Sequence, residues 1–89
     1  MTSFTKDPDA VLDYRWDWTA WLADGEAIST SEVIAPSGIT LDSDANDTTS
    51  ATAWLSGGTN GTDYDVVNRI STNQGRMDDR TMRIHVMQR

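Results

Sequence analysis

The chain has 89 residues, no cysteine, and 14 acidic side chains against seven lysines and arginines, which gives a net charge of −7. Nucleic-acid binding depends on attraction between cations and phosphates, so this charge argues against DNA or RNA as a direct partner. Neither disulfides nor a Cys/His zinc site can compensate for the small core of so short a chain. We therefore expect one domain, residues 1–89, that gains stability by homo-oligomerisation.

The distribution of apolar and charged residues bears on where the protein works. Residues 1–25 lack the basic start and apolar run of a signal peptide, and no stretch approaches the roughly 20 apolar residues of a membrane span. We expect a reducing, soluble setting and no membrane partner. Residues 1–47 carry ten acids against Lys6 and Arg15, whereas residues 48–89 carry four acids and five arginines. Such a polar molecule favours head-to-tail contacts between copies.

Short alternating runs rich in β-branched and aromatic residues predict an all-β protein, because clusters of Gly, Pro, Asn and Asp separate them and helix periodicity is hard to find. The predicted strands cover residues 11–18, 27–35, 39–42, 50–55, 64–72 and 80–87. Residues 1–10 could form an extended N-terminal arm ahead of them. We expect loops at the acidic segment 43–49 and the glycine-rich segment 56–62, and a hairpin connection at 73–76.

Alternation also predicts which side chains face the core, since successive strand residues point to opposite faces. The expected inward side chains are Leu12, Tyr14, Trp16, Trp18, Ala51, Ala53, Leu55, Tyr64, Val66, Asn68, Ile70, Met82, Ile84 and Val86. Six or seven short strands with frequent turns indicate a single immunoglobulin-like antiparallel β-sandwich of about seven strands. Tyr64 starts a late strand after a tight loop, where its hydroxyl is expected to bond a backbone group a few residues upstream, as in a tyrosine corner.

The residues that carry catalysis or hold metals are scarce. His85 is the sole histidine and alternates with apolar residues on the last strand, which favours an exposed bystander over a general base. The glycine-rich segment lacks the Lys-Ser/Thr end of a phosphate loop. Residues 42–47 begin like a calcium loop but have Asp47 where that loop needs glycine and Ala53 where it needs glutamate. We expect no enzyme activity, cofactor or metal, with a solvated acidic loop at 42–47 and cation binding there the disfavoured alternative.

Aromatic residues are unusually dense between positions 14 and 21, where three of the four tryptophans lie. Core burial is the favoured explanation for Trp16 and Trp18, whereas Trp21 and Trp54 are candidates for partial exposure. Exposed aromatics beside arginines are typical of protein interfaces, and sugar stacking is the rival interpretation. The candidate interface residues are Trp16, Trp18, Trp21, Trp54, Arg69, Asp78, Asp79, Arg80 and Arg83.

Three segments together resemble a family of small tailed-phage proteins known as fibre-tail adaptors or collar-type β-sandwich proteins. They are KDPDAVLDYRWDWTAWL at 6–22, TAWLSGGTNGTDYDVVNRIS at 52–71 and GRMDDRTMRI at 75–84. The resemblance implies a non-enzymatic sandwich repeated around the virion axis or over the capsid, assembled in the host bacterial cytoplasm. It implies partners among the tail, fibre, connector or major capsid proteins.

Three functions remain open from the sequence. The favoured one is a fibre-tail adaptor or collar component at the tail or head-tail junction, which predicts a ring of copies. A capsid decoration protein predicts copies over the head lattice, and a carbohydrate-binding module predicts exposed coplanar tryptophans. The first two both require a small stable domain with an adhesive face, so sequence alone does not separate them.

Overall fold

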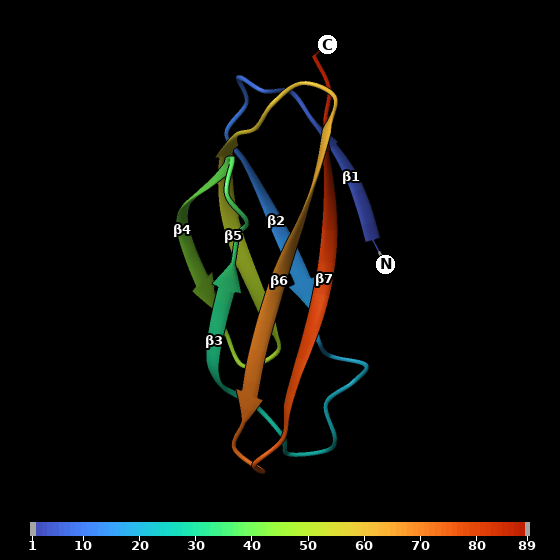
Figure 1. Cartoon of the computed structure of the whole chain (residues 1–89). Helices are drawn as coiled ribbons and strands as arrows, with labels where there is room; N and C mark the ends of the chain where they lie inside the picture. The colour runs from blue at the N-terminus through green and yellow to red at the C-terminus, as the bar shows by residue number, and fades with distance from the viewer. Residues whose placement is uncertain (1, 89) are drawn as a thin grey trace.

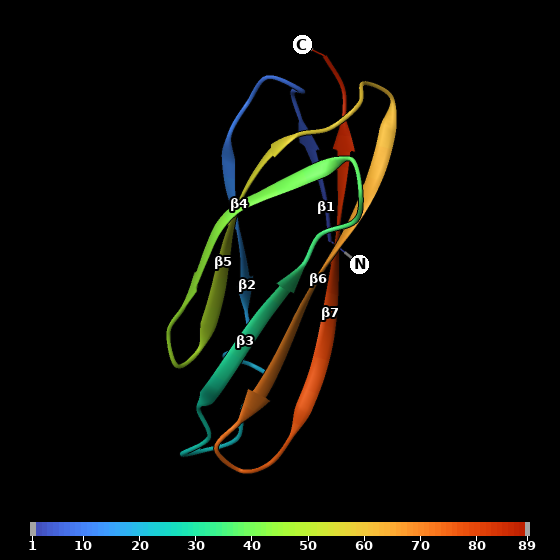
Figure 2. The same ribbon diagram turned by 60° about the vertical axis from the view of Figure 1, so that its left-hand side comes forward.

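In the computed structural model, which describes residues 2–88, the chain folds into seven β-strands that form two facing sheets (Figure 1). The strands are β1 (Thr2–Lys6), β2 (Leu12–Asp17), β3 (Ile28–Ile34), β4 (Ile39–Asn46), β5 (Ser50–Gly57), β6 (Thr62–Thr72) and β7 (Met77–Val86). One sheet has the order β1-β7-β6-β3 and the other β2-β5-β4. Figure 2 shows the layers from the side. The prediction of an all-β sandwich is confirmed. The described residues include no helix that could cross a membrane.

The strand connections are close to those of an immunoglobulin sandwich but differ at the first strand. The groups β2-β5-β4 and β7-β6-β3 have the chain order of the B-E-D and G-F-C groups of the constant type. β1 instead pairs in parallel with β7, whereas the other paired strands are antiparallel. Residues 2–6, inside the predicted N-terminal arm, thus form an edge strand. The immunoglobulin-like assignment stays a prediction.

Side chains that alternate along the strands fill the space between the sheets, as the pattern predicts. The buried apolar residues are Tyr14, Trp16, Trp18, Ile28, Val33, Ile39, Ala51, Ala53, Leu55, Tyr64, Val66, Ile70, Met82, Ile84 and Val86. Among the predicted inward residues, Leu12 differs, with 40% of its surface exposed. It begins an edge strand at the rim of the sandwich, where the opposing sheet covers it poorly. Full burial of a valine, leucine, isoleucine or methionine side chain contributes roughly 1.5–3 kcal/mol.

The acidic segment after position 42 forms a strand where we expected a loop. β4 continues to Asn46, and its residues from Ser43 onward pair with β5, from Trp54 back to Ala51. A bulge between Leu41 and Ser43 shifts the register there. The prediction was wrong because β-strand pairing requires only backbone groups, and an edge strand can direct its carboxylates to solvent. Only residues 47–49 separate β4 from β5.

Tyr64 forms the predicted bond to an upstream backbone group. Its hydroxyl accepts a hydrogen bond of 2.9 Å from the Thr59 amide. The loop also needs glycine beside this ring, because Gly58 has a φ of 100° and an added Cβ would lie 2.6 Å from a Val86 methyl. Tyr64 therefore holds the β5–β6 connection against the end of β7.

A buried lysine fixes the end of β1, which the sequence pattern did not reveal. Lys6 has no exposed surface, and its Nζ donates hydrogen bonds of 2.8 Å to the carbonyls of Asp7 and Gly57. Burial lowers the pKa of Lys6, while the carboxylates of Asp7, Asp9 and Asp42 oppose that shift. Lys6 thereby joins the end of β1 in one sheet to the end of β5 in the other.

Candidate protein interface

Two of the predicted interface tryptophans lie in the core. Trp16 and Trp18 are 5% and 0% exposed. The Trp18 indole donates a 2.9 Å hydrogen bond to Oδ1 of Asn68, which is also fully buried. Asn68 in turn donates to the Ser31 hydroxyl at 2.9 Å and the Glu32 carbonyl at 3.0 Å. The core interpretation of both rings agrees with this placement, and neither offers appreciable surface to a partner.

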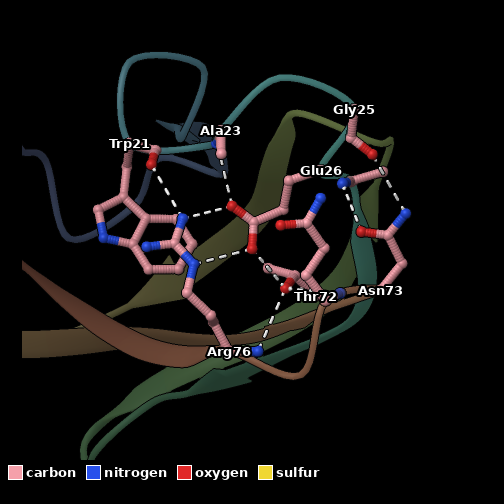
Figure 3. A network of polar contacts seen from close by, with 9 residues as sticks. Trp21, Ala23, Gly25, Glu26, Thr72, Asn73 and Arg76 are labelled. Carbon is pink, nitrogen blue, oxygen red and sulfur yellow. Dashed lines mark hydrogen bonds and ion pairs between the residues drawn. The ribbon is translucent and has the colours of Figure 1, made fainter.

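Trp21 is half-buried where the β2–β3 loop contacts the β6–β7 hairpin (Figure 3). The Arg76 guanidinium lies 4.0 Å above its ring and pairs with the carboxylate of Glu26, a side chain with no exposed surface. Glu26 also accepts hydrogen bonds from the Ala23 amide at 3.0 Å and the Thr72 hydroxyl at 2.7 Å. The bonds from Arg76 lower the pKa of Glu26 most, and together these donors bring it to about 2.

Arg80 covers the outer edge of the core beside Trp18. Its guanidinium lies 4.2 Å above the Trp18 ring and donates a 2.8 Å hydrogen bond to the Asp17 carbonyl. Stacking on a tryptophan face is favourable for arginine, particularly where water is partly excluded. Arg80 therefore joins β7 to the end of β2, a contact within the chain.

The outer face of the β6–β7 hairpin carries oppositely charged pairs on directly opposed residues. Arg69 holds Asp79 through two bonds of 2.9 and 3.1 Å, and Arg83 holds Asp65 at 3.0 Å. The ring of His85 contacts the carboxylate of Asp63 on the same face. The register places each of these residues opposite its partner. Cross-strand pairs of this kind contribute modestly to stability and leave little net charge on the hairpin face.

One end of this hairpin forms a shallow hollow lined by Arg69, Met77, Asp78 and Asp79. Met77 is 66% exposed, the largest exposed fraction among the big apolar side chains in the described part of the chain. Asp78 accepts a hydrogen bond from the Asp79 amide. The structure therefore brings three predicted residues, Arg69, Asp78 and Asp79, together around a methionine that the sequence analysis did not select.

The opposite sheet presents Trp54 on its outer face. Ala53 and Leu55 are buried, so alternation directs Trp54 outward, where it is 38% exposed. Asp13 of β2 lies directly opposite Trp54 in the register. The Ser56 hydroxyl donates a 3.0 Å bond to Asp42 on the same face. Trp54 and the hairpin hollow thus belong to different sheets.

In the segment that resembles a calcium loop, a carboxylate accepts hydrogen bonds from the backbone of the same segment. Oδ1 of Asp47 accepts hydrogen bonds from the amides of Thr49 at 2.8 Å and Ser50 at 2.7 Å. These bonds lower the pKa of Asp47 and close the turn between β4 and β5. No group of three or more His, Cys, Asp or Glu suited to a metal ion occurs within residues 2–88.

Comparison with known proteins identifies one family. The family model described as podophage GP4 fiber-tail adaptor protein gp77 matches residues 6–85 of the 89. The match includes all of the candidate interface residues. No curated protein matches the chain.

Proposed function

Since the chain belongs to the family of podophage fibre-tail adaptor proteins, we propose that it links a fibre protein to the tail through two separate docking surfaces. The match over residues 6–85 is the observation that carries this proposal. The chain is thus a structural component of a phage virion. We place it at the tail or head-tail junction, as a collar-like ring of copies assembled in the host cytoplasm.

The chemistry of the two sheets supports an adaptor with more than one docking surface. One surface is the hairpin hollow, where Met77 is exposed among Arg69, Asp78 and Asp79. The other is the outer face of the β2-β5-β4 sheet around Trp54. An adaptor must contact two different neighbours at once, and a sandwich separates two such surfaces by its full thickness. Exposed large apolar side chains bordered by polar groups are typical of docking sites.

The side chains that could act as a general acid or base are engaged in structural contacts, which supports a non-enzymatic role. His85 is paired with Asp63 on a strand face, and Glu26 is enclosed by Arg76 and Thr72. The low pKa of Glu26 keeps it ionised and bonded, which is unsuited to a general acid or base near neutral pH.

Cryo-electron microscopy of purified virions tests the position of the chain. A ring of density around the tail axis that fits the sandwich, in contact with both fibre and tail proteins, is the expected result. Copies spread over the head would make the chain a capsid decoration protein, and its absence from the particle would refute a structural role. The mass of the free protein in solution, measured alongside, tests the proposed homo-oligomer.

The carbohydrate-binding alternative makes a different prediction about tryptophans. Sugar platforms use exposed rings that lie in one plane, whereas here Trp16 and Trp18 are buried and Trp21 is covered by Arg76. Trp54 has the largest exposed fraction of the four tryptophans, and Trp21 is half-buried. Binding of the free monomer to a glycan array, abolished by Trp54→Ala, would overturn the adaptor proposal in favour of this alternative.

A further inference from the structure

We propose that the outer face of the β2-β5-β4 sheet docks a basic surface of a different virion protein, with an arginine or lysine of that protein stacked on Trp54. This inference rests on the proposed adaptor function and names the partner chemistry of one of its two surfaces. The residues concerned are Trp54 of β5, Asp13 and Asp17 of β2, and Asp42 of β4.

Trp54 differs from the tryptophans that the chain covers with its own arginines. Arg76 lies 4.0 Å above the Trp21 ring and Arg80 lies 4.2 Å above the Trp18 ring. Within residues 2–88, no cation and no other aromatic ring stacks on Trp54. A large ring exposed in the middle of a sheet face is the type of side chain that most often carries binding energy at interfaces.

The outer face that carries Trp54 is rich in carboxylates. Asp13 lies directly across the strand pair from Trp54, Asp42 is bonded to Ser56 two residues along β5, and Asp17 lies farther along β2. Arg15 is the one basic residue of this face. The three arginine–carboxylate pairs found among the described residues all lie elsewhere. Three carboxylates against one arginine leave this face with a net negative charge, which Arg15 and Arg80 near Asp17 and Lys6 near Asp42 offset only in part.

The chain has few cations of its own that are available to pair with the carboxylates of this face. Among the described residues, Arg69, Arg76 and Arg83 pair with carboxylates, and Arg80 is stacked on Trp18. Lys6 is buried and bonded to two carbonyls. The sequence suggested head-to-tail attraction between an acidic half and a basic half, but folding pairs Arg69 and Arg83 with acids of the same hairpin. Charge complementarity therefore points to a basic surface on another protein instead of a second copy.

Such a contact is specific because it combines stacking on a ring with hydrogen bonds to carboxylates. An arginine is attracted to the face of a tryptophan ring and can simultaneously donate hydrogen bonds to adjacent carboxylates. Asp13 lies opposite Trp54 on β2, and Asp42 lies on β4 in the bulge next to Ser43, the residue opposite Trp54. Both neighbouring strands therefore carry an acceptor. Attraction between a negative sheet face and a positive partner also increases the association rate at low salt.

Binding of the purified chain to particles from a phage deleted for this gene tests the inference. Trp54→Ala is expected to weaken binding about 30-fold or more, as loss of an interface hot spot does. The double variant Asp13→Lys, Asp42→Lys should bind weakly. The affinity of the wild-type chain should fall as the NaCl concentration rises, whereas the affinity of the double variant should not. Matched controls are Asp24→Lys in the β2–β3 loop and Met87→Ala after β7 of the other sheet, both exposed and off this face. Circular dichroism confirms that each variant is folded.

The outcomes separate this inference from the proposed function. Wild-type affinity of both Trp54→Ala and the charge-reversed variant would overturn the inference while leaving the adaptor function intact. Loss of self-association on Trp54→Ala would also overturn it, because the occupant would then be a second copy. Failure of the wild-type chain to bind the deletion particles, or its absence from normal virions, would instead refute the adaptor function. Carbodiimide cross-links in virions from Asp13 or Asp42 to lysines of another protein are the expected supporting result.

Discussion

Replacement of Asn68 by leucine should destabilise the sandwich strongly, although leucine is apolar and the site is in the core. Asn68 is fully buried and makes three hydrogen bonds, one of them from the indole of the fully buried Trp18. Asn68→Leu leaves that indole N–H without an acceptor. A buried donor left unpaired costs about 1–3 kcal/mol, and each of the other two lost bonds about 0.5–1.5 kcal/mol.

The expected net loss is about 2–4 kcal/mol, after allowing for the apolar surface that leucine buries. A chain of this size has a total stability on the order of 4–13 kcal/mol, so a large fraction would be lost. The melting temperature should fall by roughly 10–30 °C. Urea unfolding of Asn68→Leu measures the loss, and Asn46→Leu on the exposed strand β4 is the matched control, expected to change stability by less than about 0.5 kcal/mol.

A double-mutant cycle with Trp18→Phe tests the physical reason. Phenylalanine has no N–H, so the double variant has no unpaired indole donor facing the substituted side chain on β6. The two substitutions should therefore be less costly together than the sum of their separate effects, by about 1–3 kcal/mol. Additive effects, or a loss below about 0.5 kcal/mol for Asn68→Leu, would refute the view that this network holds the sheets together.

Three further outcomes test other parts of the structure. The pKa of Glu26 is lowered from 4.5 to about 2, so its stabilising effect is complete above pH 4.5 and is lost as the pH falls toward 2. Glu26→Gln should flatten the acid side of a Tm–pH profile, and an unchanged slope would contradict the assignment. Gly58→Ala should cost about 1–3 kcal/mol more than Gly61→Ala in urea unfolding, because both have positive φ but only the first adds a Cβ in contact with a side chain. Equal costs would disprove that contact. Tyr64→Phe removes the acceptor of the Thr59 amide, so hydrogen exchange at this amide should accelerate, and unchanged protection would show that the bond does not form in solution.

The pattern of the sequence was sufficient for the class of fold and most of the core. Alternation over residues 50–55 and 64–72 placed Ala53, Leu55 and Val66 inward, and each is fully buried. These predictions succeed because a strand has a period of two residues, and a one-residue shift would expose the whole apolar set. The bond between the Tyr64 hydroxyl and the upstream backbone was also predictable, since the loop and the ring that closes it are adjacent in sequence.

The tertiary structure alone decided which charges and rings are available to a partner. Local sequence does not show that Glu26 meets Arg76, or that Arg80 covers Trp18, because each pair is joined only when distant strands pack. The extension of β4 through an acidic segment likewise depends on backbone pairing with β5, which side-chain patterns do not report. Composition determined that the chain is acidic and rich in tryptophan. Packing determined that four of the five described arginines make contacts within the chain and that Trp54 remains exposed on a face rich in carboxylates, because long-range contacts and not residue types set which groups are already paired.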